Sequence, residues 1–229
     1  MKDGHAAASP RPASEKASRR GLLRGGAGVL VASLMVRIGV PTGEPAVART
    51  KRRPKKKGRG CGNGGTCRVF ITSSAHNGNL GGLAGADAMC QKRAKAAGLP
   101  GSYKAWLSDT KETPRSRFMK SNGPYRLVDG TKIASNWDDL ITKKANGDYL
   151  AAPINLTETG ITIAQTEFAW SNTQPDGHVL QGSTYHCSNW DAVAGNGIIG
   201  TPQLTQQFWS AFSFTPCTDD GHLFCFQQG

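Results

Sequence analysis

The sequence lacks the short motifs that mark common catalytic and nucleotide-binding sites. It has no Gly-x-Ser-x-Gly turn, no Gly-rich phosphate loop and no His-x-x-x-His or Glu-flanked pair that could bind a metal. Its five histidines are scattered, so each is expected to be a loop or packing residue. The sequence therefore does not support catalysis, and it predicts neither a metal nor a cofactor.

The chain also has no apolar run that reaches the roughly 20 residues needed to cross a bilayer. The apolar run GGAGVLVASLMV, at 25–36, follows the paired arginines of SRRGLLR and precedes the small-x-small sequence Ala46-Val47-Ala48. This order resembles a twin-arginine signal peptide over residues 1–48, without the cysteine that a lipid anchor would need. We expect export to the periplasm, cell envelope or outside, with no integral membrane span after cleavage. An uncleaved anchor is the weaker alternative.

Acidic residues are missing from residues 49–60, RTKRRPKKKGRG, which also contain no hydrophobic residue. The formal charge of +12 arises in this segment and in 1–48, so the domain expected over 61–229 is neutral, and nucleic acid is not an expected partner. The segment predicts attraction to an anionic polymer, and a solubilising spacer is the alternative. The candidate polyanion-binding residues are Arg49, Lys51, Arg52, Arg53, Lys55, Lys56, Lys57 and Arg59.

Six cysteines are present, and export would place them in an oxidising compartment. Disulfides are then expected, and a zinc cluster is the exception. The stretch CGNGGTC, at 61–67, holds two cysteines around a glycine-rich loop that is flexible enough to close on itself. We therefore expect Cys61 to pair with Cys67.

A helix is predicted over GADAMCQKRAKAAGLPG (85–101), after the turn-rich HNGNLGG, and it is expected to end at Gly98 before Pro100. Apolar residues recur there every three or four positions, which places Cys90 in the middle of a buried stripe. That position disfavours an exposed nucleophile and leaves a metal ligand, a packing residue or half of a bridge as the alternatives. The stripe consists of Leu83, Ala86, Cys90, Ala94 and Ala97.

Other patterns predict strands and one more helix. RVFITS (68–73) and YKAWLS (103–108) are typical of strands, and YRLVDGTKIA (125–134) predicts a hairpin that turns at Asp129-Gly130. SNWDDLITKKANG (135–147) predicts a short helix capped by Ser135 or Asn136 that stops near Asn146-Gly147. HLFCFQQ (222–228) predicts a last strand with Leu223 and Cys225 on one face and Phe224 and Phe226 on the other.

The order of these segments resembles endostatin-like domains and a family of exported bacterial proteins within the C-type-lectin-like fold. It is carried by GADAMCQKRAKAAGLPGSYKAWLSD, SRFMKSNGPYRLVDGTKIASNWDDL, FAWSNTQPDGHVLQGSTYHCSNW and PCTDDGHLFCFQQ, over residues 68–228. The resemblance implies an α+β domain of two short helices on a twisted, mostly antiparallel sheet with long irregular loops. It also implies disulfides between Cys90 and Cys225 and between Cys187 and Cys217. Endostatin's zinc-binding histidines have no counterpart here, so no zinc is implied.

Two sets of residues are ligand-binding candidates. Gln174 and Asp176 belong to a Gln-Pro-Asp triplet that resembles the calcium motif of true C-type lectins, but calcium needs about six to eight oxygen ligands. The lectins' Trp-Asn-Asp triplet is replaced by Trp209-Ser210-Ala211, so a tight turn at 175–177 is the alternative. Trp190 and Trp209 are candidate stacking platforms for sugar rings, although tryptophans in such domains also serve as core anchors. Trp106 and Trp137 match core positions of the resembling family.

We therefore expect an exported, non-enzymatic binding or adhesion module whose partner is a glycan, an anionic envelope polymer or a protein. The specific ligand is expected on the long-loop face formed by about residues 165–215. A secreted enzyme acting on glycans is the alternative, because a fold does not determine a function. It would need two convergent carboxylates among Glu158, Glu167, Asp176 and Asp191. A calcium-dependent lectin is a third hypothesis.

Overall fold

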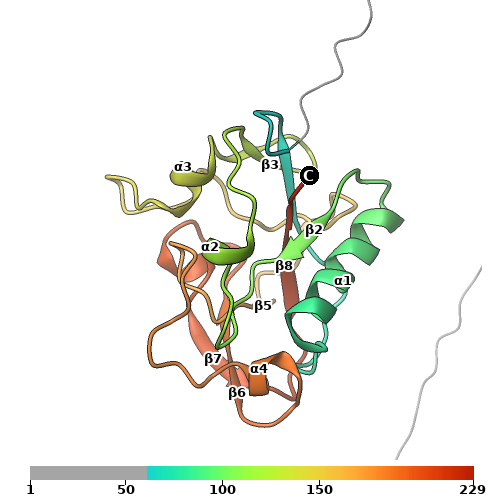
Figure 1. Ribbon diagram of the computed structural model, residues 1–229, viewed down its shortest axis with the longest axis vertical. Coiled ribbons are helices and arrows are strands. Elements are labelled where there is room, and N and C mark those ends of the chain that lie inside the picture. Colours follow the sequence, from blue (N-terminus) through green and yellow to red (C-terminus); the bar gives the residue numbers. More distant parts are fainter. Residues whose placement is uncertain (1–60) are drawn as a thin grey trace, which may run out of the picture. The chain divides into compact units, whose positions relative to one another are not determined.

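The computed structural model describes residues 61–229, and the predicted signal peptide and basic segment lie outside them. The described chain is a mixed α/β protein with one twisted, open sheet and few short helices (Figure 1). The helices are α1 (Gly82–Ala96), α2 (Pro114–Arg117), α3 (Trp137–Ile141), α4 (Cys187–Trp190) and the 3-10 helix η1 (Gln207–Trp209). The strands are β1 (Cys67–Ile71), β2 (Tyr103–Ala105), β3 (Tyr125–Leu127), β4 (Lys132–Ala134), β5 (Ala169–Trp170), β6 (Asn196–Gly200), β7 (Ser213–Pro216) and β8 (His222–Gln227).

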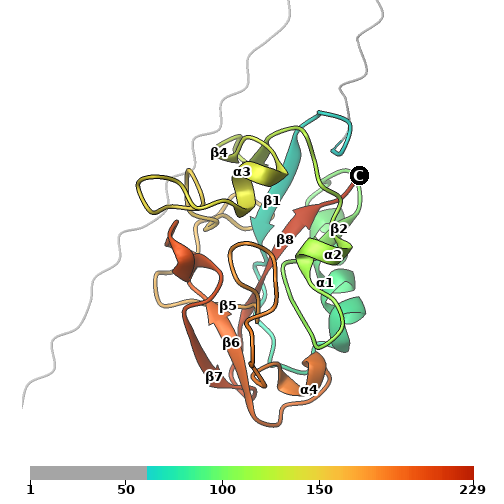
Figure 2. The same cartoon turned by 60° about the vertical axis from the view of Figure 1, so that its left-hand side comes forward.

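Strand β8 occupies the middle of the sheet, in the order β4-β3-β1-β8-β5-β6-β7. One edge of β8 pairs with β1, and the other edge is divided between β2 and β5 (Figure 2). The β5–β8 and β1–β3 pairs are parallel, and the other strand pairs are antiparallel. Every residue of β8 is buried, as expected for a strand covered on both faces.

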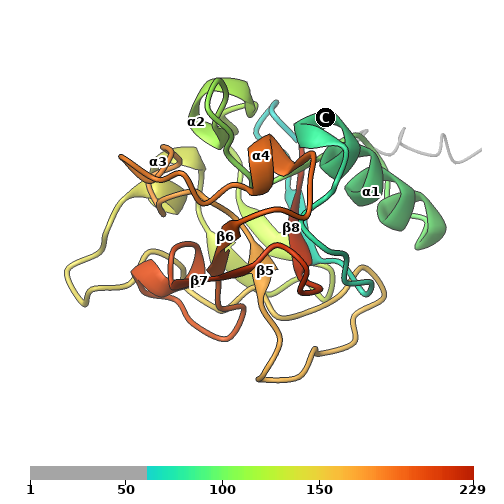
Figure 3. The same ribbon diagram turned by 90° about the horizontal axis from the view of Figure 1, so that it is seen from below.

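The side chains of β8 alternate between two hydrophobic clusters, as the sequence predicted. Leu223 and Cys225 belong to the cluster that contains the buried side of α1, which we call the α1 face. Phe224 and Phe226 belong to the cluster that contains Trp137 of α3, which we call the α3 face. Seen from below, α1 and α3 lie on opposite sides of β8 (Figure 3). The domain therefore has a core on each side of one central strand.

Helix α1 forms where the three- and four-residue spacing predicted it. Its buried residues are Leu83, Ala86, Cys90 and Ala94. Gly98 takes the left-handed backbone at φ 68°, and the Leu99 N–H donates to the Ala94 carbonyl at 2.9 Å while the Gly98 N–H donates to the Lys95 carbonyl. This is a Schellman ending, in which a glycine satisfies the last free carbonyls of a helix. Ala97, the last residue of the predicted stripe, is only partly buried.

Helix α3 begins as predicted and ends earlier than predicted. The Asn136 side chain accepts a hydrogen bond from the Asp139 N–H, so Asn136 is the cap. The helix ends at Ile141 rather than near Asn146, and Thr142 is extended. The reason is that Trp137 and Leu140 are buried against the α3 face, whereas the polar residues after Ile141 give a further turn nothing to bury.

The predicted hairpin is present as β3 and β4. Gly130 has φ 96°, and its N–H donates to the Leu127 carbonyl at 3.0 Å. Gly130 alone supplies the left-handed conformation, while Asp129 accepts hydrogen bonds from the backbone and hydroxyl of Thr131. The predicted strand at 103–108 is shorter, since β2 ends at Ala105.

Three disulfides join the chain, and the described residues include no free cysteine. Cys61 is bonded to Cys67, Cys90 to Cys225, and Cys187 to Cys217. The Cys90–Cys225 bond ties α1 to the central strand, across 135 positions of sequence. These are the pairs expected from the cysteine spacing and from the endostatin-like resemblance.

The turn named α4 has a left-handed backbone that the sequence did not predict. Its four residues all have positive φ, between 49° and 66°, and none is glycine. The His186 ring nitrogen accepts the Asn189 N–H at 2.8 Å, and the Trp190 indole donates to the Ser108 carbonyl at 2.8 Å. Cys187 is also fixed by its disulfide, so both ends of the turn are held by contacts to the core.

Candidate ligand-binding site

A cavity of about 400 Å³ opens on the long-loop side of the sheet. It is formed by the loop that leads from β5 to α4, by one residue of β6 and by the segment that enters β7. Because β7 is the last strand of the sheet, its side chains lie at an open edge. The lining consists of Leu180, Gln181, Gly182, Ser183, Tyr185, Ile198, Ala211, Phe212, Ser213 and Phe214.

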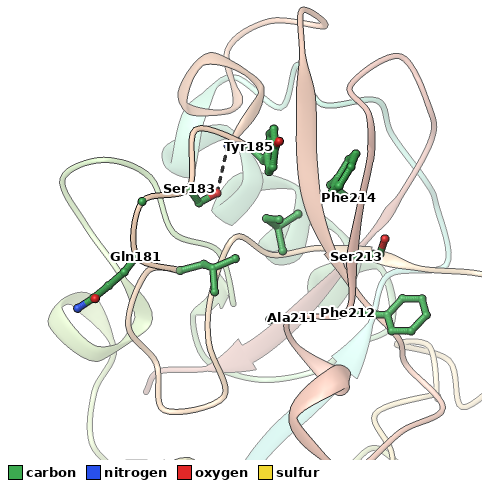
Figure 4. Close-up of a pocket in the computed structure, with 10 residues that line it drawn as sticks. Gln181, Ser183, Tyr185, Ala211, Phe212, Ser213 and Phe214 are labelled. Carbon is green, nitrogen blue, oxygen red and sulfur yellow. Dashed lines mark hydrogen bonds between the residues drawn. The ribbon is translucent and has the colours of Figure 1, made fainter.

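Two aromatic rings stand together at this cavity. The ring centroids of Tyr185 and Phe214 are 4.9 Å apart and the rings are inclined by 27°, so they are stacked (Figure 4). Both are anchored through Ile198, which pairs with Phe214 in the β6–β7 register and donates its N–H to the Tyr185 carbonyl. Phe214 is 54% exposed and Tyr185 is 38% exposed, whereas Ile198 is buried. The structure thus holds two large apolar rings in solvent over an apolar base.

A second pair of exposed rings lies beside the first. Phe212 and Phe208 meet edge to face, with centroids 5.8 Å apart. Phe212 lines the cavity but extends away from the stacked pair (Figure 4). It also borders a smaller pocket of about 290 Å³ that includes Glu167 and Phe168. Exposed apolar side chains gathered in one area are typical of interaction sites, whereas apolar side chains scattered singly are ordinary on a protein surface.

The cavity lining contains no Lys, Arg, His, Asp or Glu. The lining residues with polar side chains are Gln181, Ser183, Tyr185 and Ser213, and all four side chains are uncharged amides or hydroxyls. The Ser183 hydroxyl accepts the Tyr185 N–H at 3.1 Å, which fixes the loop under the ring. Such a site can bind an uncharged ligand that is partly apolar. Its lining contains no carboxylate, imidazole or amine that could act as a general acid or base.

One comparison with known proteins identifies a family. The model of the DUF1554 family, described as a protein of unknown function, matches residues 73–206. The chain belongs to the DUF1554 family. The match spans α1 to β6 and includes Tyr185 and Ile198 of the cavity, while Ala211 to Phe214 follow it. No curated protein matches this DUF1554 chain.

The two tryptophan candidates of the DUF1554 domain are core residues, which corrects their assignment as stacking platforms. Trp190 and Trp209 are both 0% exposed. Trp209 packs against Trp106 with ring centroids 5.0 Å apart, and Trp190 packs against Trp170 at 5.7 Å. Position in a loop region did not distinguish buried rings from exposed ones. The signal for the exposed rings was Phe212 and Phe214 alternating with small residues just before Pro216, a pattern that suits an edge strand.

Gln174 and Asp176 lie in a tight turn rather than at the cavity. The Gly177 N–H donates to the Gln174 carbonyl at 2.9 Å, and Gly177 has φ 85°. The Asp176 carboxylate accepts the His178 N–H and lies 3.2 Å from the His178 ring. The Gln174 amide donates to the Val179 carbonyl at 3.3 Å. Both side chains are thus used within their own loop.

Ser210, the middle residue of the Trp209-Ser210-Ala211 sequence compared above with the lectin triplet, is completely buried. Its hydroxyl accepts the Trp106 indole N–H at 2.7 Å and donates to the Thr173 carbonyl at 2.7 Å. This hydroxyl therefore belongs to a buried polar network instead of facing solvent. Over residues 61–229, no group of three His, Cys, Asp or Glu side chains is placed to hold a metal ion.

The four carboxylates considered for glycan hydrolysis have separate surroundings. Glu158 is buried, accepts hydrogen bonds from the backbone and hydroxyl of Ser73, and lies 3.9 Å from Arg93. Glu167 contacts the His222 ring at 3.1 Å. Asp176 contacts His178 as described, and Asp191 pairs through its backbone with Asn79. None of these contacts joins two of the four.

A half-buried loop next to α1 holds a serine and a histidine that sequence reasoning did not connect. The His76 ring lies 2.9 Å from the Ser74 hydroxyl, which also accepts the Arg93 Nε–H at 3.0 Å. Burial lowers the pKa of His76 below its usual 6.5, and the nearby Arg93 charge lowers this pKa further. A neutral imidazole near pH 7 suits the contact with Ser74, and the hydrogen bond from Arg93 to Ser74 fastens this loop to α1.

Within the described part of the DUF1554 chain, no helix is long and apolar enough to cross a membrane. The candidate polyanion-binding residues from Arg49 to Arg59 lie outside the described residues.

Proposed function

We propose that this DUF1554 protein is an exported, non-enzymatic binding module that recognises a glycan at the Tyr185–Phe214 ring pair. One observation carries the proposal: two stacked, exposed rings border a cavity whose polar groups are uncharged amides and hydroxyls. An aromatic face binds the C–H face of a sugar ring, and amides and hydroxyls exchange hydrogen bonds with its hydroxyl groups. The rings lie within the long-loop region, 165–215, that the sequence favoured.

The proposal includes a C-type-lectin-like, endostatin-like assignment for the α/β domain. It is supported by the disulfide from the first helix to the last strand and by the second bridge within the span of the first. Three disulfides also favour an oxidising location, such as the periplasm, the envelope or the outside. Export by the twin-arginine route rests on residues 1–48 alone.

Binding is favoured over glycan hydrolysis because the lining has no carboxylate and so cannot supply the usual pair of acids. Attraction of an anionic polymer to residues 49–60 is a separate proposal, since the cavity lining has no cation. This second proposal predicts an affinity for heparin that falls steeply as the salt concentration rises and that disappears when residues 49–60 are deleted.

The test is a glycan array probed with the full chain and with a Tyr185→Ala/Phe214→Ala variant. We expect the variant to lose at least about tenfold in affinity for every glycan that the native chain binds, which corresponds to roughly 1.4 kcal/mol. The matched control is Phe208→Ala, which removes an exposed ring that does not line the cavity. Equal binding by the double variant and the native chain, or no binding of any glycan by the native chain, would overturn the proposal.

A further inference from the structure

We infer that the cavity takes one uncharged N-acetylated hexosamine unit of a glycan, an inference that rests on the proposed function. The inference rests on two features of the cavity lining other than the ring pair. The first is the absence of any charged side chain, and the second is the apolar surface next to the rings.

The uncharged lining selects against charged sugars. A uronic or sialic acid would bring a carboxylate into the cavity without a lysine or arginine to balance it. An unacetylated amino sugar would bring an ammonium group without a carboxylate partner. Moving an unpaired charge out of water is costly, so both classes of sugar are disfavoured. A neutral sugar leaves only hydroxyls and amides to satisfy, and the lining residues Gln181, Ser183 and Tyr185 carry side chains able to form such hydrogen bonds.

The apolar part of the lining selects among neutral sugars. Leu180, Ile198 and Ala211 contribute aliphatic surface to the cavity in addition to the rings. A plain hexose presents hydroxyl groups to such a surface, and each buried hydroxyl without a partner loses free energy. An acetamido group presents a methyl group instead, together with one amide N–H and one carbonyl for the polar rim. Burial of one methyl group favours binding by roughly fourfold.

The size of the cavity matches a single sugar unit with its substituent. Its volume is about 400 Å³, near the lower end of the roughly 300–1,000 Å³ found for small-molecule sites. The cavity is open at the edge strand β7, so the neighbouring units of a longer chain can continue into solvent. The expected ligand is therefore one acetylated unit within an oligosaccharide.

The experiment compares three tetrasaccharides that share the β-1,4 linkage and differ at one substituent. They are the tetramers of N-acetylglucosamine, of glucose and of glucosamine, titrated calorimetrically against the full chain. We expect the acetylated tetramer to bind at least about fourfold more tightly than the glucose tetramer. The cationic glucosamine tetramer should bind most weakly of the three.

A variant that fills the cavity separates the acetamido contact from the ring contact. Ala211→Leu adds aliphatic volume to the lining and leaves both residues of the stacked pair, Tyr185 and Phe214, unchanged. We expect it to weaken binding of the acetylated tetramer more than binding of the glucose tetramer, so that the preference for the acetylated tetramer is lost. Thermal unfolding of the variant checks that the domain still folds.

The outcomes distinguish this inference from the proposed function. If the acetylated and glucose tetramers bind equally and both depend on Tyr185 and Phe214, the site is a glycan site and the acetamido inference is wrong. A galacturonate tetramer that binds more tightly than the acetylated one and depends on the same rings would also overturn the inference. If none of these tetramers binds, the inference is wrong, and the glycan array described above remains the test of the proposed function.

Discussion

Ser188 has φ 54° in a run of left-handed residues that contains no glycine. A side chain on a left-handed backbone costs about 1–2 kcal/mol per residue, because Cβ approaches the following carbonyl oxygen. The cost is offset here by the disulfide of Cys187 and by the buried Trp190. The turn is therefore an example of local strain held in place by tertiary contacts.

Replacing Ser188 with glycine should stabilise the domain. The side chain of Ser188 is exposed, so its removal loses no packing, and glycine adopts positive φ freely. After the entropy that glycine adds to the unfolded chain is subtracted, the expected gain is about 0.5–1 kcal/mol in free energy of unfolding. Urea unfolding measures it, with Ser188→Ala as the control that retains Cβ and should gain nothing. A loss of stability in the glycine variant would contradict a strained turn.

At the scale of elements, α1 and β8 determine how the domain is assembled. Cys90 lies in the middle of the buried side of α1, and Cys225 lies on the α1 face of β8. Both cysteines are completely buried, and their bond closes the longest disulfide loop of the three. The longer the loop that a disulfide closes, the more it restricts the unfolded chain.

Removing the α1–β8 disulfide should cost far more stability than removing the local one. For Cys90→Ala/Cys225→Ala we expect a loss of up to about 5 kcal/mol in free energy of unfolding, and for Cys61→Ala/Cys67→Ala about 2 kcal/mol. The second pair is the matched control, since it also removes two buried sulfurs. Urea unfolding of both variants gives the comparison. Equal losses of unfolding free energy in the two variants would contradict the expectation that the longer disulfide loop stabilises the domain more.

The elements that could be predicted are those whose pattern repeats. The spacing of Leu83, Ala86 and Cys90 predicted the buried side of α1, and the alternation in HLFCFQ predicted both faces of β8. The end of α3 could not be predicted, because it depends on what the core leaves uncovered after Ile141. The left-handed turn α4 could not be predicted either, since its residues adopt that backbone only under tertiary contacts.

The candidate site was predictable as a region and not as a set of residues. The composition of 165–215 indicated long loops with aromatics, and the cavity lies there. Choosing between Trp190 and Tyr185 required knowing which ring reaches the core. Trp190 is buried because its indole donates to Ser108 and packs on Trp170, and both partners are distant in sequence. Such long-range contacts produce no local sequence pattern from which the burial of a ring could be predicted.

At the scale of the whole molecule, two buried phenols link stability to alkaline pH. Tyr103 lies on the α1 face and Tyr125 on the α3 face. Burial raises the pKa of each from 10.0 to about 12. Between these values the folded chain keeps both phenol protons, while an unfolded chain would lose them. The contribution of the two protonated phenols to the free energy of unfolding is therefore fully present below pH 10 and is lost as the pH rises toward 12.

We expect the free energy of unfolding to fall as the pH rises from 10 to 12, and phenolate absorbance to appear together with unfolding. Urea unfolding across this range, followed by circular dichroism and ultraviolet absorbance, measures both. Tyr103→Phe should flatten the decline without a large loss near neutral pH, because the Tyr103 hydroxyl is buried without a hydrogen-bond partner among the described residues. Ionisation of both phenols near pH 10 in a folded domain would contradict this account.

The place of β8 in the sheet has a consequence for biosynthesis. The strands that flank it, β1, β2 and β5, all precede it in the chain, so a ribosome finishes the centre of the sheet after its surroundings. Until residues 222–227 emerge, β1 has an open edge and Cys90 has no partner. Folding of the nascent domain must therefore wait for its last strand.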